Sequence, residues 1–377
     1  MLGADRFLLN PSYKRLRLGL LTNHATLTSA KLPLAMALLQ SGFRIIRIFS
    51  PEHGVASQGE DGKHQSHHVD VITGLPVVSL YGNQLTPALD DIDDLDAVIV
   101  DLPNIGCRFY TYWWTITHML ESCALSGRKV ILLDRPNQSR RTASQSEGPL
   151  LQEAKCSSFL GRWTMPLTFS FTCGQLARWF CHERKIAVDL EVVITDHDAG
   201  VFLPPSPAIN HPEVIEIYPC TGLFEGIGIS NGRGTTFPFR VLGAPWIDAN
   251  QWHSDFQKMR IPGLEAVPFL FQPVWGNFKD QTCQGLYFTV SDFAAFKPVE
   301  TGLLLLRYLF ATYEKQINES PYPTVANPTG QNHLDRLLGI PQSFHTITSL
   351  PNQELRTLLR VNDWTERVDR FLQNSES

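Results

Sequence analysis

Residues 97–134 read AVIVDLPNIGCRFYTYWWTITHMLESCALSGRKVILLD and place two short apolar runs on either side of a longer segment. The runs Ala97–Asp101 and Lys129–Asp134 are rich in Val, Ile and Leu, which is typical of buried strands. The segment around Trp113–Leu125 is predicted to be helical. Strand, helix and strand in this order predict parallel strands whose faces are covered by helices.

The same alternation runs through the first half of the chain and stops near Phe202. From there the sequence is rich in Gly, Pro and aromatic residues, beginning with LPPSP at 203–207, and has no clear βαβ rhythm. We therefore expect an α/β fold with a parallel sheet flanked by helices in residues 1–202 and a second, smaller α+β domain in 203–377. The further predicted strands are Leu18–Thr22, Arg44–Phe49, Pro76–Tyr81, Leu190–Thr195 and Gln284–Val290, and the further predicted helices are Ser29–Gln40, Gly174–Glu183 and Thr301–Tyr313.

Composition limits the classes of partner. The chain has 377 residues, of which 43% are hydrophobic and 18% charged, and this is enough apolar material for two cores. A formal net charge of -5 and the lack of a long basic run argue against a nucleic-acid partner. An acidic sugar needs only one or two arginines, so such a ligand stays compatible with this charge.

Cysteine usage and the N-terminus bear on location. The seven cysteines are scattered without a Cys-x-x-Cys pair, which favours reduced, mostly buried thiols over a disulfide framework or a zinc knuckle. The first residues lack the features of a secretory signal, and the apolar run near 303 is interrupted by Arg307. We expect a cytoplasmic protein without a membrane span.

The densest chemical motif is Phe49-Ser50-Pro51-Glu52-His53-Gly54. Glu52 and His53 follow a predicted strand, and the flanking Pro and Gly favour a tight turn. A rigidly held carboxyl group is what general acid–base catalysis on a glycosidic bond requires. The alternative is that Glu52 only caps the turn. Other polar residues also follow predicted strands, where the ligands of parallel sheets bind: Asn23, His24, Asp101, Asp134 and Arg135.

A second cluster spans residues 223–246, LFEGIGISNGRGTTFPFRVLGAPW. Its glycines allow close approach of the backbone to a ligand, Arg233 can pair with a carboxylate, and Trp246 offers an apolar face to a sugar. Glu225 supplies a second carboxylate. A sugar-binding loop is the favoured interpretation, and a structural loop is the alternative.

Within this cluster, Gly228-Ile229-Ser230-Asn231-Gly232 matches the Gly-x-Ser-x-Gly pattern of serine hydrolases. That pattern needs a strand before the serine and a helix after it. The residues that follow, including Pro238, are poor helix formers. We interpret the match as accidental, and a serine esterase using Ser230 stays as a rival hypothesis.

Two further clusters, one aromatic and one rich in histidine, have alternative interpretations. Arg108, Tyr110 and Tyr112 could line a carbohydrate cleft, or their aromatic rings could pack inward at the start of a helix. A histidine group (His64, His67, His68, with Asp70) lies in a Gly/Ser/Gln-rich loop, which favours solvated side chains over a zinc site. The first strand leads into Asn23-His24-Ala25-Thr26 instead of a glycine-rich fingerprint, so a dinucleotide cofactor is not supported.

Taken together, these motifs resemble the exo-β-N-acetylmuramidases of the NamZ type. The resemblance implies a Rossmann-like N-terminal domain, a smaller C-terminal domain and a cleft between them. It further implies release of terminal N-acetylmuramic acid from the non-reducing end of peptide-free glycan fragments, with Glu52 as the leading catalytic candidate. The matching segments occur in family order: GLLTNHATL (19–27), FSPEHG (49–54), TGLPVVSLYG (73–82), RFYTY (108–112), LLDRPN (132–137), EGP (147–149), PPSPAIN (204–210) and the run from Glu225 to Trp246.

The chain departs from the family pattern at three acidic positions, which are Asn104, Gln175 and Asn231 here. The family's Arg-His-Gly is also missing around residues 169–171, and the export signal that most members carry is not visible. These changes leave two alternatives open, an altered specificity or a sugar-binding descendant without activity.

The resulting hypothesis is a glycosidase that uses no metal and no organic cofactor and acts on small peptidoglycan-derived saccharides. Glu52 acts as general acid or acid/base with His53 beside it, and Glu225 is the second carboxylate. The separation of the two carboxyl groups would decide between a retaining and an inverting course. Arg233 and Arg108 hold the acidic substituent of the sugar, and Tyr110, Tyr112 and Trp246 shape the pocket. The rivals are a non-catalytic muropeptide-binding protein and the Ser230 esterase.

Overall fold

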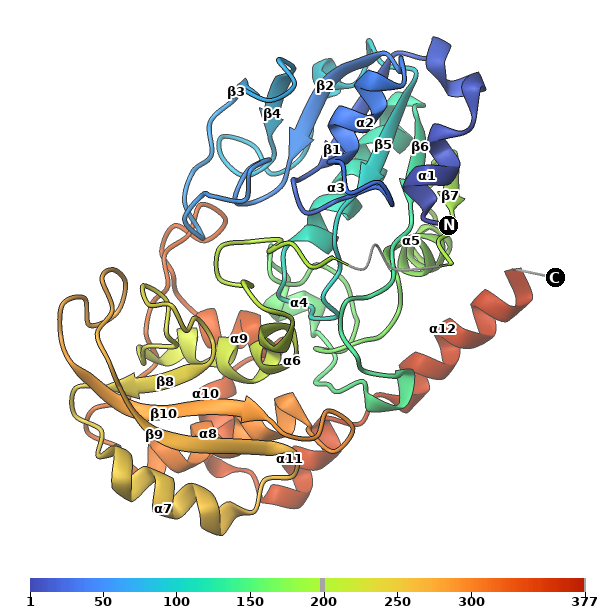
Figure 1. The fold of residues 1–377 in the computed structure, drawn as a ribbon. Coiled ribbons are helices and arrows are strands. Elements are labelled where there is room, and N and C mark those ends of the chain that lie inside the picture. Colours follow the sequence, from blue (N-terminus) through green and yellow to red (C-terminus); the bar gives the residue numbers. More distant parts are fainter. Residues whose placement is uncertain (197–200, 376–377) are drawn as a thin grey trace.

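A seven-stranded sheet forms the first half of the computed structural model, which describes residues 1–196 and 201–375 (Figure 1). The strand order is β3-β4-β2-β1-β5-β6-β7, and every neighbouring pair is parallel except β3 and β4. The predicted parallel, Rossmann-like sheet is thus confirmed. Its strands are β1 Leu18–Thr22, β2 Ile45–Ser50, β3 His68–Val69, β4 Pro76–Ser79, β5 Ala97–Asp101, β6 Lys129–Leu133 and β7 Leu190–Val193.

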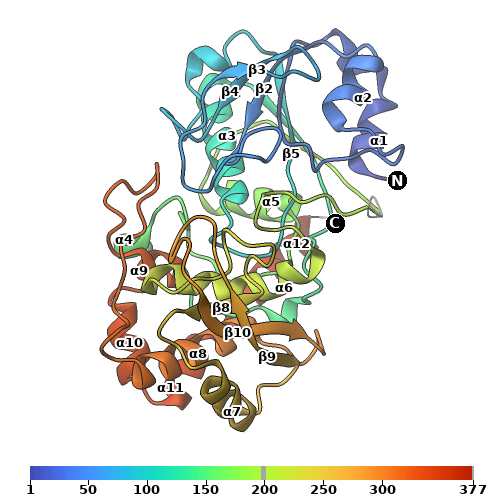
Figure 2. The same cartoon turned by 60° about the vertical axis from the view of Figure 1, so that its left-hand side comes forward.

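Helices cover both faces of this sheet, with α1 and α2 on one side and α3 on the other (Figure 2). Successive strand residues point to opposite faces, so each strand serves two cores. Ile99 of β5 packs in one cluster with Leu38 of α2, whereas its neighbour Val100 packs in the other with Met119 of α3. The helices of this half are α1 Gly3–Leu8, α2 Leu34–Gln40, α3 Tyr112–Ser126, α4 Glu153–Cys156 and α5 Cys173–Glu183, with 3-10 turns at Pro11–Arg15, Leu89–Asp91 and Ala143–Gln145.

The start of α2 differs from the prediction, which began the helix at Ser29. Thr28 instead exchanges backbone hydrogen bonds with the turn up to Leu32, and the helix begins only after Pro33. Proline disfavours a helical conformation of the residue before it, so Leu32 cannot continue a helix into Pro33 easily. A helix is present in the predicted segment, but it spans only Leu34–Gln40.

The second half contains a three-stranded antiparallel sheet in the order β8-β10-β9, with helices around it (Figure 1). This is the smaller α+β unit expected from the sequence. Its strands are β8 Val241–Ala244, β9 Leu264–Phe271 and β10 Cys283–Val290. Its helices are α6 Pro212–Thr221, α7 Ala249–Met259, α8 Pro298–Thr312, α9 His333–Leu338, α10 Ser343–Ser349, α11 Asn352–Leu358 and α12 Asn362–Ser375, with a 3-10 turn at Gly222–Ile227.

The last helix returns to the first half. In Figure 1, α12 runs back toward α5, and the ring of Phe371 lies 5.4 Å from that of Trp179. One apolar cluster also extends from Val100 in the large sheet to Leu286 in the small one. The two halves therefore share a core, and the domain limits 1–202 and 203–377 stay a prediction. None of the described helices is long and apolar enough to cross a bilayer.

Glu147 joins the two halves. Its buried carboxylate accepts hydrogen bonds from the backbone N–H groups of Val299 at 3.1 Å and Glu300 at 2.9 Å, in the first turn of α8. Burial raises the pKa of Glu147 from 4.5 to about 7, although these two N–H groups favour the charged form.

This raised pKa predicts a stability that falls with rising pH. The folded state keeps the proton on Glu147 between about pH 4.5 and 7, where the unfolded chain has lost it, so the contribution is complete below 4.5 and lost through 7. We expect urea unfolding to show that wild type loses on the order of 3 kcal/mol more than Glu147→Gln between pH 4.5 and 8. Parallel pH profiles of the two proteins would contradict this.

Candidate active site

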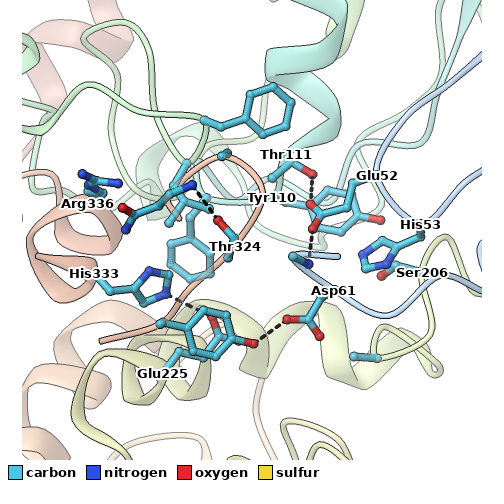
Figure 3. Close-up of a pocket in the computed structure, with 18 of the residues that line it drawn as sticks. Glu52, His53, Asp61, Tyr110, Thr111, Ser206, Glu225, Thr324, His333 and Arg336 are labelled. Atoms are coloured by element: carbon cyan, nitrogen blue, oxygen red, sulfur yellow. Dashed lines mark hydrogen bonds and ion pairs between the residues drawn. The ribbon is translucent and has the colours of Figure 1, made fainter. Parts of the chain in front are cut away.

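A pocket lies where the carboxyl edge of the large sheet meets the second half (Figure 3). It contains about 720 Å³ of space that no protein atom fills, part of it open to solvent. Its polar lining comes from both halves and its wall is aromatic. The charged or ionisable side chains that line it are Glu52, His53, Asp61, Glu225, Arg233, His333 and Arg336, and the large apolar ones include Phe109, Phe159, Ile209, Tyr218 and Phe239.

Glu52 follows β2 directly and its side chain is buried at the pocket. Oε1 accepts a hydrogen bond from the N–H of Gly62 at 2.8 Å, and Oε2 accepts one from the hydroxyl of Thr111 at 2.7 Å. Thr111 precedes α3 without capping it, so its hydroxyl is available to the carboxylate. Both carboxyl oxygens are thereby fixed in direction, as Figure 3 shows.

The turn after β2 aims His53 into the same pocket. The N–H of Gly54 donates to the carbonyl of Pro51 at 3.1 Å, and His53 itself has a φ of 70°, in the left-handed region. Its Nδ1 lies 2.7 Å from the carbonyl of Gly59. A carbonyl only accepts, so Nδ1 carries the hydrogen, and Nε2 of the neutral ring keeps its lone pair.

Arg233 lies between two carboxylates. It forms an ion pair with Asp61 from the first half, and its Nε and Nη2 lie 3.1 Å and 2.9 Å from Oε1 of Glu225. Its guanidinium also lies over the ring of Phe239, 4.7 Å from the centroid. The hydroxyl of Tyr322 donates to Asp61 as well. This network connects the loop after β2 to the second half.

The charges of this network stabilise one another. Burial alone would raise the pKa of Glu225, but Arg233 and His333 outweigh it and hold the pKa below its ordinary value. Burial likewise opposes the charge on Arg233, yet Asp61 and Glu225 raise its pKa. Nε2 of His333 lies 3.5 Å from Oε2 of Glu225, and its ring stacks on Tyr322. Glu225 is therefore an ionised group whose Oε1 accepts the guanidinium of Arg233 and whose Oε2 faces His333.

Several predicted residues shape the floor behind the pocket. Tyr110 lines the pocket, but Tyr112 lies behind it and donates its hydroxyl to the carbonyl of Pro205 at 2.5 Å. Asn23 donates to the same carbonyl at 3.0 Å, and His24 lies 3.0 Å from the carbonyl of Pro204. Asn23 and His24 thus fix the proline-rich segment between the halves.

Five other predicted residues do not line this pocket. Asp101 forms a two-pronged ion pair with Arg135, at 2.5 Å and 2.8 Å, and Asp134 accepts the N–H of Gly174 at 2.8 Å at the start of α5. Trp246 packs on Tyr313, with ring centroids 5.1 Å apart. These side chains were predicted to bind the substrate, but they lie outside the pocket lining.

Arg108 is the fifth, and it is fully buried. Its guanidinium donates to the carbonyls of Pro149, Met165 and Leu337 at 2.8, 3.1 and 2.9 Å. No carboxylate among the described residues pairs with it, and burial lowers its pKa to about 10. Arg108 therefore ties three segments of the backbone together and is out of reach of a substrate.

Models of a known protein family match nearly the whole chain. The N-terminal model of exo-β-N-acetylmuramidase NamZ matches residues 18–213, and the C-terminal model of the same family matches residues 216–377. The chain belongs to the exo-β-N-acetylmuramidase NamZ family.

Relatives of the NamZ family extend the match over most of the chain. The chain is 34% identical to the peptidoglycan β-N-acetylmuramidase NamZ of Bacillus subtilis over 325 residues, which is 82% of this chain and 77% of that protein. Two crystal structures of DUF1343 family proteins from Bacteroides fragilis are also similar. One has a TM-score of 0.83 at 25% identity, covering 98% of this chain and 97% of that one, and the other has 0.70 at 26%, covering 98% and 96%.

The three acidic positions that are neutral in this NamZ-family chain have different surroundings. Asn104 donates to the carbonyl of Phe171 at 2.9 Å, and Gln175 closes a capping box at the start of α5. Both are structural and lie outside the pocket lining, so their neutrality leaves the pocket unchanged. Only Asn231 touches the network, with its Nδ2 3.4 Å from Oε1 of Glu225.

Ser230 has none of the surroundings of a nucleophile. It is buried, its backbone pairs with Gly243, and its hydroxyl lies 3.4 Å from the N–H of Gly232. Within the described ranges it has no hydrogen bond to a histidine. We expect Ser230→Ala to keep glycan release within about twofold of wild type in a product assay. Loss of ester hydrolysis in this variant, with ester turnover by wild type, would support the esterase instead.

The pocket residues that were not predicted include Asp61, Tyr81, Thr111, Tyr322, His333 and Arg336. Tyr81 and Thr111 lie in motif segments that were noted but not chosen. Asp61, His333 and Arg336 carry no local signal, because they reach the pocket from loops and a six-residue helix.

Proposed function

We propose that this protein is a glycoside hydrolase that releases terminal N-acetylmuramic acid from the non-reducing end of peptidoglycan-derived fragments, with Glu52 as its catalytic acid. The observation that supports this is Glu52 itself, a buried carboxyl group at the pocket that is hydrogen-bonded by Gly62, Thr111 and Tyr81, in a chain of the muramidase family. The aromatic wall suits the apolar faces of a sugar ring.

The hydrogen bonds from Gly62 and Thr111 distinguish the two carboxyl oxygens of Glu52 and indicate which of them can carry the acidic proton. The N–H of Gly62 can only donate, so Oε1 of Glu52 stays an acceptor throughout. The hydroxyl of Thr111 can donate or accept, so Oε2 can carry a proton. General acid catalysis therefore proceeds from Oε2, which protonates the oxygen of the leaving sugar.

The contacts of Glu225, Asp61 and His53 bear on which residue acts as the second catalytic group. Arg233 pairs with one oxygen of Glu225 and one oxygen of Asp61, and the hydroxyl of Tyr322 donates to the other oxygen of Asp61. Because Glu225 pairs with Arg233 in this way, we assign to Glu225 the positioning of Arg233. His53, whose Nε2 keeps a lone pair, then accepts a hydrogen bond from the attacking water or a sugar hydroxyl.

The test uses the disaccharide MurNAc-β-1,4-GlcNAc as substrate and mass spectrometry of the products. Free MurNAc and GlcNAc in equal amounts are the expected result. A disaccharide with GlcNAc at its non-reducing end should release no sugar. If the disaccharide binds but is recovered intact after long incubation, the protein is a sugar-binding member of the family. The neutral Asn231 beside Glu225 is the feature that favours this second candidate.

A further inference from the structure

The arginines near the pocket are not equivalent. The residues that line it include two arginines, Arg233 and Arg336, and no lysine. The charge of Arg233 is already balanced by Asp61 and Glu225. Arg108, the other arginine expected to hold the acidic group of a substrate, is buried against backbone carbonyls. Neither of the two predicted arginines has a charge left for an anion.

Arg336 has a free charge. It lies on α9, half-buried, and its guanidinium has no hydrogen bond or ion pair with any residue in the described parts of the chain. Its acidic neighbour Asp335 accepts the N–H groups of Gln342 at 2.9 Å and Ser343 at 2.7 Å, so this carboxylate is engaged elsewhere. Arg336 is therefore positioned on the pocket without a protein partner.

The backbone that carries Arg336 is well fixed. Leu337 and Leu338 are buried, and the carbonyl of Leu337 is bound by the guanidinium of Arg108 at 2.9 Å. Arg336 and Glu52 both line the pocket, and in Figure 3 they lie at opposite sides of the view with Thr324 between them. A sugar that presents its glycosidic oxygen to Glu52 can extend another substituent toward Arg336.

The chemistry of the substrate supplies an anion for this place. N-acetylmuramic acid differs from N-acetylglucosamine by a lactyl ether on O3, which ends in a carboxylate. Arginine recognises a carboxylate with two parallel N–H···O bonds. The remaining pocket charge is unfavourable to an anion, since the two carboxylates Asp61 and Glu225 outnumber the single cation Arg233.

We propose that Arg336 binds the lactyl carboxylate of the terminal sugar and so distinguishes N-acetylmuramic acid from N-acetylglucosamine. This inference rests on the proposed function for the identity of the substrate. It assigns to Arg336 the specificity for the acidic substituent that was expected of Arg233 and Arg108.

Calorimetric binding of free MurNAc and free GlcNAc tests this without any turnover. Wild type should bind MurNAc more tightly than GlcNAc. Arg336→Gln should weaken MurNAc binding about 10- to 100-fold and change GlcNAc binding less than twofold, because only MurNAc carries the carboxylate. Arg336→Lys should recover part of the loss. Arg44→Gln, at an exposed arginine of the first half, is the control and should bind both sugars as wild type does.

One further ligand and one further readout separate the outcomes. MurNAc with its lactyl group converted to the amide should bind wild type as weakly as MurNAc binds Arg336→Gln. An unchanged MurNAc affinity in Arg336→Gln, or an equal loss for both sugars, would overturn the role of Arg336. Selective loss of MurNAc binding in a protein that never cleaves the disaccharide would support Arg336 and refute only the hydrolase activity.

Discussion

The Glu52→Gln variant is expected to release MurNAc from the disaccharide about 10³-fold more slowly than wild type, with its affinity for the disaccharide nearly unchanged. The amide keeps an oxygen that accepts the N–H of Gly62 and gains an NH₂ that the hydroxyl of Thr111 can accept. The site thus keeps its geometry and loses only the transferable proton, whose contribution is about 10²- to 10⁴-fold.

Single-turnover kinetics should place this loss in kcat and leave the dissociation constant within a few-fold. Glu60→Gln is the matched control, since Glu60 is an exposed glutamate in the same loop and should have no effect. Equal rates for wild type and Glu52→Gln would mean that another carboxyl group supplies the proton. A large loss of binding in Glu52→Gln would instead indicate a structural role for the hydrogen bonds to Gly62 and Thr111.

The sheet was predictable because its signals are local. Each parallel strand is a short apolar run with a polar stop, and the polar residues after β2 had to lie at the carboxyl edge of the sheet. The two-residue β3, which pairs antiparallel with β4, is not an apolar run and was not predicted. Glu52 and His53 were therefore identified from the six consecutive residues Phe49 to Gly54. The turn that orients them is closed by a hydrogen bond from the N–H of Gly54 to the carbonyl of Pro51, and both residues belong to the same motif.

The partners of these residues were not predictable, because they lie far away in the chain. Thr111 reaches Glu52 from 59 residues away, and Asp61 pairs with Arg233 across 172 residues. The role of Arg108 was not predictable for the same reason, because its contacts also lie far away in the chain. An arginine before a run of aromatics suits a sugar cleft and a packed core equally, and the choice depends on Gly161 and Gly339, which approach its side chain in the fold.

Arg233→Ala is expected to have the largest effect on stability, with a loss of about 3–5 kcal/mol in the free energy of unfolding at pH 7. Asp61 and Glu225 are almost buried, with side-chain exposures of 11% and 9%, and both would keep their charge without a guanidinium beside them. Arg17→Ala is the matched control. It removes an ion pair to Asp96 that is more than one third exposed on both sides, so we expect a loss below about 1 kcal/mol.

The pH dependence should distinguish this loss from simple loss of packing. In wild type the depressed pKa of Glu225 contributes stability that is present above about pH 4.5 and is lost as pH falls through the folded-state pKa. Without Arg233, burial becomes the dominant influence and raises that pKa, so protonation of Glu225 removes an unpaired buried charge and stabilises the variant as pH falls. Urea unfolding should therefore show the gap between wild type and Arg233→Ala shrinking from pH 8 to pH 4. A gap of constant size would mean that Arg233 stabilises the fold through its packing on Phe239 and not through the two carboxylates.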